Sequence, residues 1–340
     1  MNLTLKFIII FIIFLKSNGY INAQVSKFRV MFFNTENYFD TFDDSKTLDD
    51  DFTPTGSYHW SWGKFLAKRD ALAKIIIAVG EGTMPSIIGL CEIENRFVLN
   101  QLVIETPLAK FDYRIVHRDS PDSRGIDVAL LYNPLEFKLL YQNFYEISKK
   151  FKTREILYAK GILGATDTLH VFVNHFPSKR GGAKTSEPRR VAAALELKRL
   201  CDSVRNTNEN ANILIMGDFN DTPNSDVISK TLYAKDNFNE ISKSDLYNLA
   251  VPLMKKGEGT IKYQGVWEFI DLMFVSGNML NNTNKIYCSQ TDFKIFNVPY
   301  LLEKDNAFVG NKPKRTYIGM KYNGGISDHL PVYLQLTIEK

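Results

Sequence analysis

Residues 213–221 have the sequence ILIMGDFND, in which a short apolar run is followed at once by two acids and an asparagine. A run of this length and composition is typical of a buried strand. A single Asp or Asn after a strand is usually a turn former. Residues i and i+2 of an extended segment point to the same side, however, so the pattern also predicts a polar pair formed by Asp218 and Asn220.

The same pattern recurs along the chain, where polar residues lie at the edge of one apolar run after another. Asn34 and Glu36 follow the run 30–33 and are expected to form a second polar pair. Asp271 lies within the apolar run 269–273, where an acid is costly to bury unless it is paired. We therefore expect a histidine or a metal ion beside it. The other members of the series are Glu92, Asn174, His175, Asp328 and His329.

Short runs of β-branched and aromatic residues dominate the chain and predict strands. Two segments with apolar residues at helical spacing, 62–79 and 188–204, predict helices. Because strands outnumber helices, we expect an α/β fold of two packed β-sheets with helices on the outside. Strands are expected at 28–33, 86–91, 113–116, 127–132, 157–163, 168–176, 213–216, 267–275 and 330–338.

The first 23 residues are expected to be a secretory signal peptide, because Lys6 and Lys16 flank the apolar run 7–15 and the segment ends at Ala23. A membrane anchor is the alternative, but a spanning helix needs about 18 to 20 apolar residues. We therefore expect an exported protein, periplasmic or secreted, in which residues 24–340 form a single domain.

The composition of the mature chain leaves its binding partner open. Residues 1–23 contain two of the 42 basic residues and none of the 38 acids, so the net charge falls from +4 to +2 on their removal. A strongly basic domain would favour nucleic acid as a partner, and this chain is nearly neutral. Its three scattered cysteines are too few for a disulfide framework or a zinc site.

Six segments of the sequence resemble, in order, the motifs of the endonuclease/exonuclease/phosphatase superfamily. They span residues 33 to 331 and are FNTEN (33–37), GLCE (89–92), VNHF (173–176), GDFND (217–221), IDLM (270–273) and SDHLP (327–331). The resemblance implies a four-layer α/β sandwich and a catalytic domain that hydrolyses phosphate esters with the help of Mg²⁺ or Mn²⁺. A hard cation of this kind prefers oxygen ligands.

The resemblance also implies a role for each motif residue. Asp218, positioned by Asn220, would orient and deprotonate the attacking water. His329, paired with Asp271, would stabilise charge on the phosphoryl oxygens, and His175 would act on the leaving-group side. The implied metal ligands are Glu92, Asn34, Glu36 and Asp328, and Asn174 would contact a phosphate oxygen. Glu36 stands where abasic-site endonucleases carry aspartate, which puts its role as a ligand in question.

The expected substrate is a nucleic acid. Arg124 resembles a phosphate contact of deoxyribonuclease-like members, and the basic loop 178–190 with Lys179 and Arg180 follows His175 directly. The alternative interpretations are a surface arginine and a solvated loop. A sphingomyelinase-like enzyme or an inositol-phosphate phosphatase, acting on a phospholipid head group or a small phosphate ester, remains an alternative. A non-catalytic binding module is disfavoured because every catalytic motif residue is present.

Two further expectations concern ions and assembly. The acid-rich segment 40–51 is interpreted as a solvated surface, with a structural Ca²⁺ site as the alternative. No motif indicates a stable protein partner, and we expect a monomer.

Overall fold

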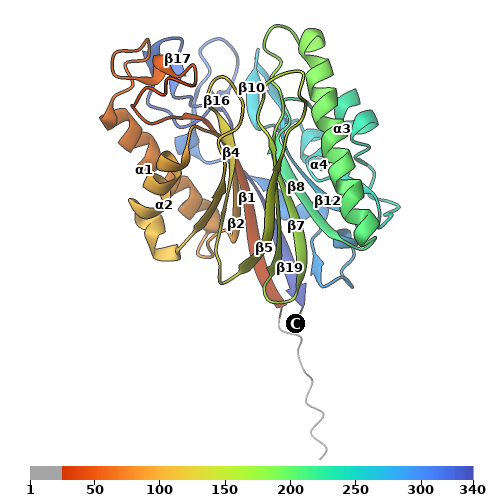
Figure 1. Cartoon of the computed structure of the whole chain (residues 1–340). Helices are drawn as coiled ribbons and strands as arrows, with labels where there is room; N and C mark the ends of the chain where they lie inside the picture. The colour runs from red at the N-terminus through yellow and green to blue at the C-terminus, as the bar shows by residue number, and fades with distance from the viewer. Residues whose placement is uncertain (1–24, 340) are drawn as a thin grey trace, which may run out of the picture.

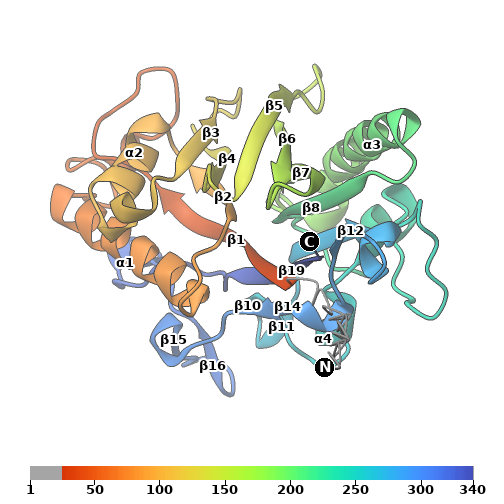
Figure 2. The same ribbon diagram turned by 90° about the horizontal axis from the view of Figure 1, so that it is seen from below.

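The computed structural model describes residues 25–339, so the predicted signal peptide lies outside the described part of the chain. Two β-sheets stand face to face in the middle of the molecule (Figure 1). Helices α1 (Trp62–Gly80) and α2 (Arg96–Ile104) cover the outer face of one sheet, and α3 (Ala183–Thr207) covers the outer face of the other (Figure 2). The predicted α/β sandwich is therefore confirmed. No helix within residues 25–339 is long and apolar enough to cross a membrane.

Both sheets are mixed. The first has the order β13 (Ile286–Tyr287), β19 (Val332–Glu339), β1 (Val25–Tyr38), β2 (Ile87–Ile93), β4 (Asp127–Tyr132) and β3 (Arg114–His117), and β14 (Phe293–Ile295) also pairs with β19. The second has the order β5 (Phe137–Tyr145), β6 (Ile156–Leu163), β7 (Asp167–His175), β8 (Asn212–Asp218), β12 (Asp271–Ser276) and β9 (Leu246–Asn248).

Shorter elements lie around the two sheets. They are the helix α4 (Val251–Met254) and the strand pairs β10 (Ile261–Tyr263) with β11 (Val266–Glu268), β15 (Leu302–Lys304) with β16 (Asn311–Pro313), and β17 (Tyr317–Ile318) with β18 (Lys321–Tyr322).

Alternation along β1 builds two separate cores. Val30 and Phe32 face the core between the sheets, whereas Met31 and Phe33 face the core beneath α1 and α2. The two sheets are packed tightly at Gly89 of β2, where a Cβ would lie 2.9 Å from Met216 Sδ of the other sheet and 3.1 Å from the ring of Phe32. A side chain at position 89 would force these core side chains to shift.

Each predicted strand and helix has a counterpart in the structure, but several observed elements were not predicted. They are the strand β5, the helices α2 and α4, and the short strands β9, β10 and β13 to β18. The expected strand 267–275 is interrupted at residues 269 and 270, so that Asp271 is the first residue of β12 rather than a residue inside a strand. Helix α3 begins at Ala183, before Pro188, because Arg190 holds its first turn through Ala183 O (3.0 Å) and Ser186 Oγ (2.8 Å).

Strand direction brings the motifs to one end of the molecule. β1 and β2 run parallel, as do β7 and β8, so their carboxyl ends lie at the same edge of their sheets. β12 is antiparallel to β8 and pairs Asp271 with Asp218, and β19 is antiparallel to β1 and begins just after His329. Strand ends separated by up to 300 residues of sequence therefore meet at one site.

Candidate active site

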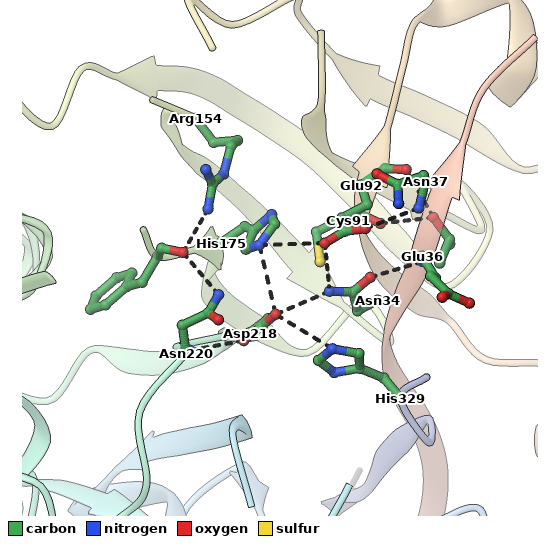
Figure 3. Close-up of polar contacts among 12 residues, drawn as sticks. Asn34, Glu36, Asn37, Cys91, Glu92, Arg154, His175, Asp218, Asn220 and His329 are labelled. Carbon is green, nitrogen blue, oxygen red and sulfur yellow. Dashed lines mark hydrogen bonds and ion pairs between the residues drawn. The ribbon is translucent and has the colours of Figure 1, made fainter. Parts of the chain in front are cut away.

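Side chains from five strand ends converge at the open edge of the two sheets (Figure 3). Asn34 of β1 donates from Nδ2 to Asp218 Oδ2 of β8 (3.0 Å) and to Glu92 Oε1 of β2 (3.3 Å), which joins the two sheets. His175 Nε2 of β7 lies 3.6 Å from Asp218 Oδ2 and 3.8 Å from Glu92 Oε1. His329 Nε2 lies 3.9 Å from the same Asp218 oxygen.

Asp218 is at the centre of this cluster and is almost fully buried. Burial, together with the neighbouring Asp271 carboxylate, raises the pKa of Asp218 to about 7, against the lowering influence of His329. Its Oδ1 accepts a hydrogen bond from the backbone N–H of Asn220 (2.8 Å). One carboxylate oxygen is thus fixed by the backbone, and the other faces two histidines.

His329 is held by Asp271, as predicted. The His329 Nδ1 to Asp271 Oδ2 distance is 2.8 Å, and Asp271 is fully buried. Burial opposes the charged imidazole, but the carboxylates of Asp271 and Asp218 outweigh it and hold the pKa of His329 well above its ordinary value. His329 is therefore a cation at neutral pH with its Nε2–H directed toward Asp218.

His175 differs from His329 in its charge. Burial and the positive charges of Arg154 and Arg124 hold the pKa of His175 well below its ordinary value, so the ring is neutral. Cys91 lies beside it and forms a tight group with His175 and Asp218. Burial raises the pKa of the Cys91 thiol, which stays protonated.

The two predicted polar pairs do not form, because the backbone leaves the extended conformation. Glu36 and Asn220 have φ values of +50° and +49°, so neither side chain lies beside that of the residue two before it. Asn220 Nδ2 instead donates to Phe176 O (3.0 Å). Glu92 also has a positive φ of +59°. Left-handed backbone at three non-glycine residues of one cluster is the kind of strain that gathers at functional sites.

Glu36 shares its cationic partner with Asp328, another of the predicted metal ligands. Its carboxylate accepts hydrogen bonds from Arg315 Nε (3.1 Å) and from the backbone N–H of Thr316 (2.6 Å). Arg315 Nη2 also donates to Asp328 Oδ2 (2.9 Å), so one guanidinium joins both acids. The role of Glu36 as a metal ligand stays a prediction, because its carboxylate is paired here with a cation of the protein.

The donor set at the mouth of the site nevertheless fits a divalent cation. Glu92 and Asp328 keep part of their side chains exposed, 17% and 26% respectively. Burial raises the pKa of Glu36 to about 7, and repulsion from Asp328 adds to it against the lowering influence of Lys68 and Arg315. A hard cation with oxygen ligands would relieve that repulsion. Asn34 directs its N–H groups toward Glu92 and Asp218, so it orients these acids rather than offering them an oxygen.

The predicted substrate contacts divide into two groups. Arg124 and Arg180 line one cavity beside the catalytic cluster. Lys179 instead lies 3.7 Å from Asp221 and 3.9 Å from Glu268, and it does not line that cavity. Asn174 is fully buried and donates to Met216 O (3.3 Å), and its contact with a phosphate oxygen stays a prediction.

Sequence reasoning missed three basic residues of the site. Arg154, Lys68 and Arg315 lie outside every motif. Lys68 is buried and donates to Glu36 O (2.6 Å) and Thr316 Oγ1 (2.7 Å), and burial lowers its pKa to about 8. A lysine on the apolar face of the predicted helix 62–79 was the one available signal, because a buried cation requires a partner.

The acid-rich segment is only partly solvated. Asp43, Asp44, Asp50 and Asp51 are exposed as expected, but Asp40 and Asp49 are buried. Asp40 accepts from Asn95 Nδ2 (2.9 Å), and Asp49 accepts from Thr47 Oγ1 (3.1 Å). The Ca²⁺ site was the alternative interpretation of this segment and stays an alternative.

Comparisons with known proteins agree with this architecture. A sequence model of the Endonuclease/Exonuclease/phosphatase family matches residues 29–338. A protein of that family from Bacteroides vulgatus is 18% identical and covers 92% of this chain and 100% of its own, with a TM-score of 0.56. No curated protein sequence gave a match.

Two other solved structures have names that state an activity or a bound molecule. The Bacteroides thetaiotaomicron mannosyl-6-phosphatase is 15% identical, with coverage of 91% and 99% and a TM-score of 0.56. D. rerio TDP2 complexed with a single strand DNA product is 12% identical, with coverage of 92% and 99% and a TM-score of 0.54. At such low identity these likenesses show a shared fold.

Proposed function

The chain belongs to the endonuclease/exonuclease/phosphatase family and is a phosphoesterase of that fold, and we propose that it is an exported, divalent-metal-dependent phosphodiesterase that cleaves nucleic acid.

The proposal of export is based on the sequence of residues 1–23 alone. Mass spectrometry of the exported protein is expected to place the mature N-terminus at Gln24, and a retained Met1 would contradict this.

The observation that carries the proposal is the position of two histidines on either side of Asp218, with His175 Nε2 at 3.6 Å and His329 Nε2 at 3.9 Å from Asp218 Oδ2. A phosphodiester is an anion attacked by an oxygen nucleophile, so its hydrolysis needs a base for water and a positive group for the phosphoryl oxygens. Asp218, with a pKa near 7, is suited to accept the water proton. The cationic His329 donates to a phosphoryl oxygen, and the neutral His175 faces the leaving-group side.

A divalent cation fits at Glu92 and Asp328, where it would supply positive charge against the charge that develops on the phosphoryl oxygens. Asn34 holds Glu92 and Asp218 in register, and Asp271 fixes the orientation of His329. These residues orient the reacting groups whether the cation is Mg²⁺ or Mn²⁺.

Two substitutions are expected to change Mn²⁺ affinity in opposite directions. Glu92→Gln removes a carboxylate while keeping the shape of the side chain, and it should weaken Mn²⁺ binding by about tenfold or more. Arg315→Gln removes the guanidinium that pairs with Glu36 and Asp328, and it should strengthen binding several-fold, by roughly the strength of a partly exposed ion pair. Isothermal titration with MnCl₂ measures both without reference to activity. Weaker binding in Arg315→Gln would show that Arg315 organises the acids instead of competing for them.

Nucleic acid is favoured as the substrate by the basic side chains on the His175 side of the cluster, where Arg124 and Arg180 line a cavity. The likeness to a mannosyl-6-phosphatase favours a second candidate, hydrolysis of a sugar phosphate monoester. No contact in the described site specifically favours a sphingomyelinase-like enzyme or an inositol-phosphate phosphatase.

A substrate panel decides among these candidates. Purified mature protein with Mg²⁺ or Mn²⁺ is assayed on plasmid DNA, single-stranded RNA, sphingomyelin, an inositol phosphate and mannose 6-phosphate. We expect cleavage of DNA or RNA and its loss in excess chelator. Preferential release of phosphate from mannose 6-phosphate would replace nuclease by phosphatase, and full turnover in excess chelator would exclude the metal.

A further inference from the structure

A cavity of about 430 Å³ lies beside the catalytic cluster, between the start of α3 and the segment that precedes β6. Its volume falls within the range of roughly 300 to 1,000 Å³ that is usual for ligand sites. Five basic side chains and one acid line it, together with the ring of Phe151. The basic residues are Arg124, Lys152, Arg154, Arg180 and Arg189, and the acid is Asp122.

The charge of this cavity is not balanced by the protein. Asp122 accepts from both Arg154 Nη1 (2.9 Å) and Arg124 Nε (3.2 Å), so one carboxylate serves two guanidinium groups. Arg154 is only 3% exposed, and its Nε has no hydrogen-bond partner. Lys152, Arg180 and Arg189 are exposed at the rim. A buried arginine with an unused donor and an excess of neighbouring cations favours an anionic ligand.

The cavity is connected to the catalytic cluster through a single residue. Arg154 Nη2 donates to Phe176 O (2.6 Å), the same carbonyl oxygen that accepts from Asn220 Nδ2 (Figure 3). Phe176 follows His175, and the positive charge of Arg154 contributes to the low pKa of that histidine. Arg154 therefore links the lining of the cavity to the backbone on the His175 side of the cluster.

We propose that this cavity binds a second phosphate group of the substrate, carried by the nucleotide next to the scissile diester. Arg124 and Arg154 form its floor, and Lys152 and Arg189 close over the phosphate from the rim. The half-buried ring of Phe151, with Arg189 5.5 Å from its centroid, adds the aromatic surface that single-stranded nucleic acid sites use for stacking. The inference rests on the proposed phosphodiesterase function and adds to it a preference for substrates with two neighbouring phosphates.

Thymidine dinucleotides test the preference. TpT has only the scissile diester, whereas pTpT and TpTp add one terminal phosphate at either end. We expect the wild-type protein to cleave one of the two phosphorylated forms with a kcat/KM roughly ten to a hundred times that for TpT, the range of hydrogen bonds to a charged group. Lys152→Ala/Arg189→Ala should lose this preference and keep the wild-type rate on TpT.

A matched control removes two positive charges from the segment that carries Lys152, at positions outside the cavity. Lys149 and Lys150 are exposed and do not line it, so Lys149→Ala/Lys150→Ala should keep the preference. An equal loss in this control would assign the effect to general electrostatics. Equal rates on TpT, pTpT and TpTp would overturn the second-phosphate site while leaving the phosphodiesterase function intact.

A binding measurement separates the site from catalysis. In pTpT or TpTp with a methylphosphonate linkage, the terminal phosphate is the only anion, and calorimetry should show it binding to the wild type and at least about tenfold more weakly to Lys152→Ala/Arg189→Ala. Retained binding with no hydrolysis of any diester would refute the proposed function and support the anion site. Inorganic phosphate that binds as tightly as the dinucleotide analogue would make this a site for free anions and overturn its assignment to the substrate.

Discussion

Asp218→Asn is expected to lower kcat by about 10²- to 10⁴-fold, the range that general-base assistance supplies. The asparagine oxygen can still accept from the Asn220 N–H, which bonds Asp218 Oδ1 at 2.8 Å in the wild type. What is lost is the oxygen that faces His175 and His329 and accepts from Asn34 Nδ2 (3.0 Å), because an amide nitrogen at that position accepts no proton. Steady-state kinetics on the best substrate of the panel measure the effect.

The control for this variant is Asp226→Asn, the same chemical change at an exposed acid that pairs with Lys230 by 2.9 Å. It should leave kcat within about twofold of the wild type, because substitutions of exposed residues usually have small effects. Both variants should melt close to the wild-type temperature. A kcat for Asp218→Asn within tenfold of the wild type would remove Asp218 from the role of base.

The parts of this site that follow from the sequence are those fixed by strand ends. Glu92, His175, Asp218 and His329 each lie at the edge of an apolar run, and the direction of the strands brings such edges together. The cost of burying an unpaired acid predicted a histidine or a metal ion beside Asp271, and the family resemblance identified the partner as His329. Chemistry that depends on burial and strand order was therefore accessible before the structure.

The parts that did not follow depend on local backbone or on isolated residues. The prediction that residues i and i+2 point to the same side assumes an extended backbone. It failed at Glu36 and Asn220, where φ is positive. Arg315 and Arg154 are single basic residues in loops, and no spacing distinguishes them from surface arginines until the acids that they contact are known. Helix α2 is short, and its apolar residues also suit a strand.

Removing the Asp271–His329 pair is expected to have an effect of similar size. His329→Ala deletes a cationic donor aimed at the phosphoryl oxygens and should cost about 10²- to 10³-fold in kcat, as removal of one oxyanion donor does. Asp271→Asn should cost a comparable factor, because its carboxylate fixes the ring at 2.8 Å and is the largest influence that keeps it charged. The double variant should be little worse than the worse single variant, as expected when two residues act as a unit.

The positioning role of Asp271 requires a readout that mere structural damage would not change. Nitrogen chemical shifts of His329, followed by NMR as a function of pH, should show its pKa falling in Asp271→Asn, because only Asp218 and Asp328 would still favour the imidazolium. The His117–Asp127 contact of 3.0 Å, a buried histidine–aspartate pair outside the catalytic cluster, gives the matched control. Asp127→Asn should leave the pKa of His329 unchanged, whatever it does to stability. If the losses of Asp271→Asn and His329→Ala multiply in the double variant, with the pKa of His329 unmoved, the two residues act independently and the pairing carries no catalytic role.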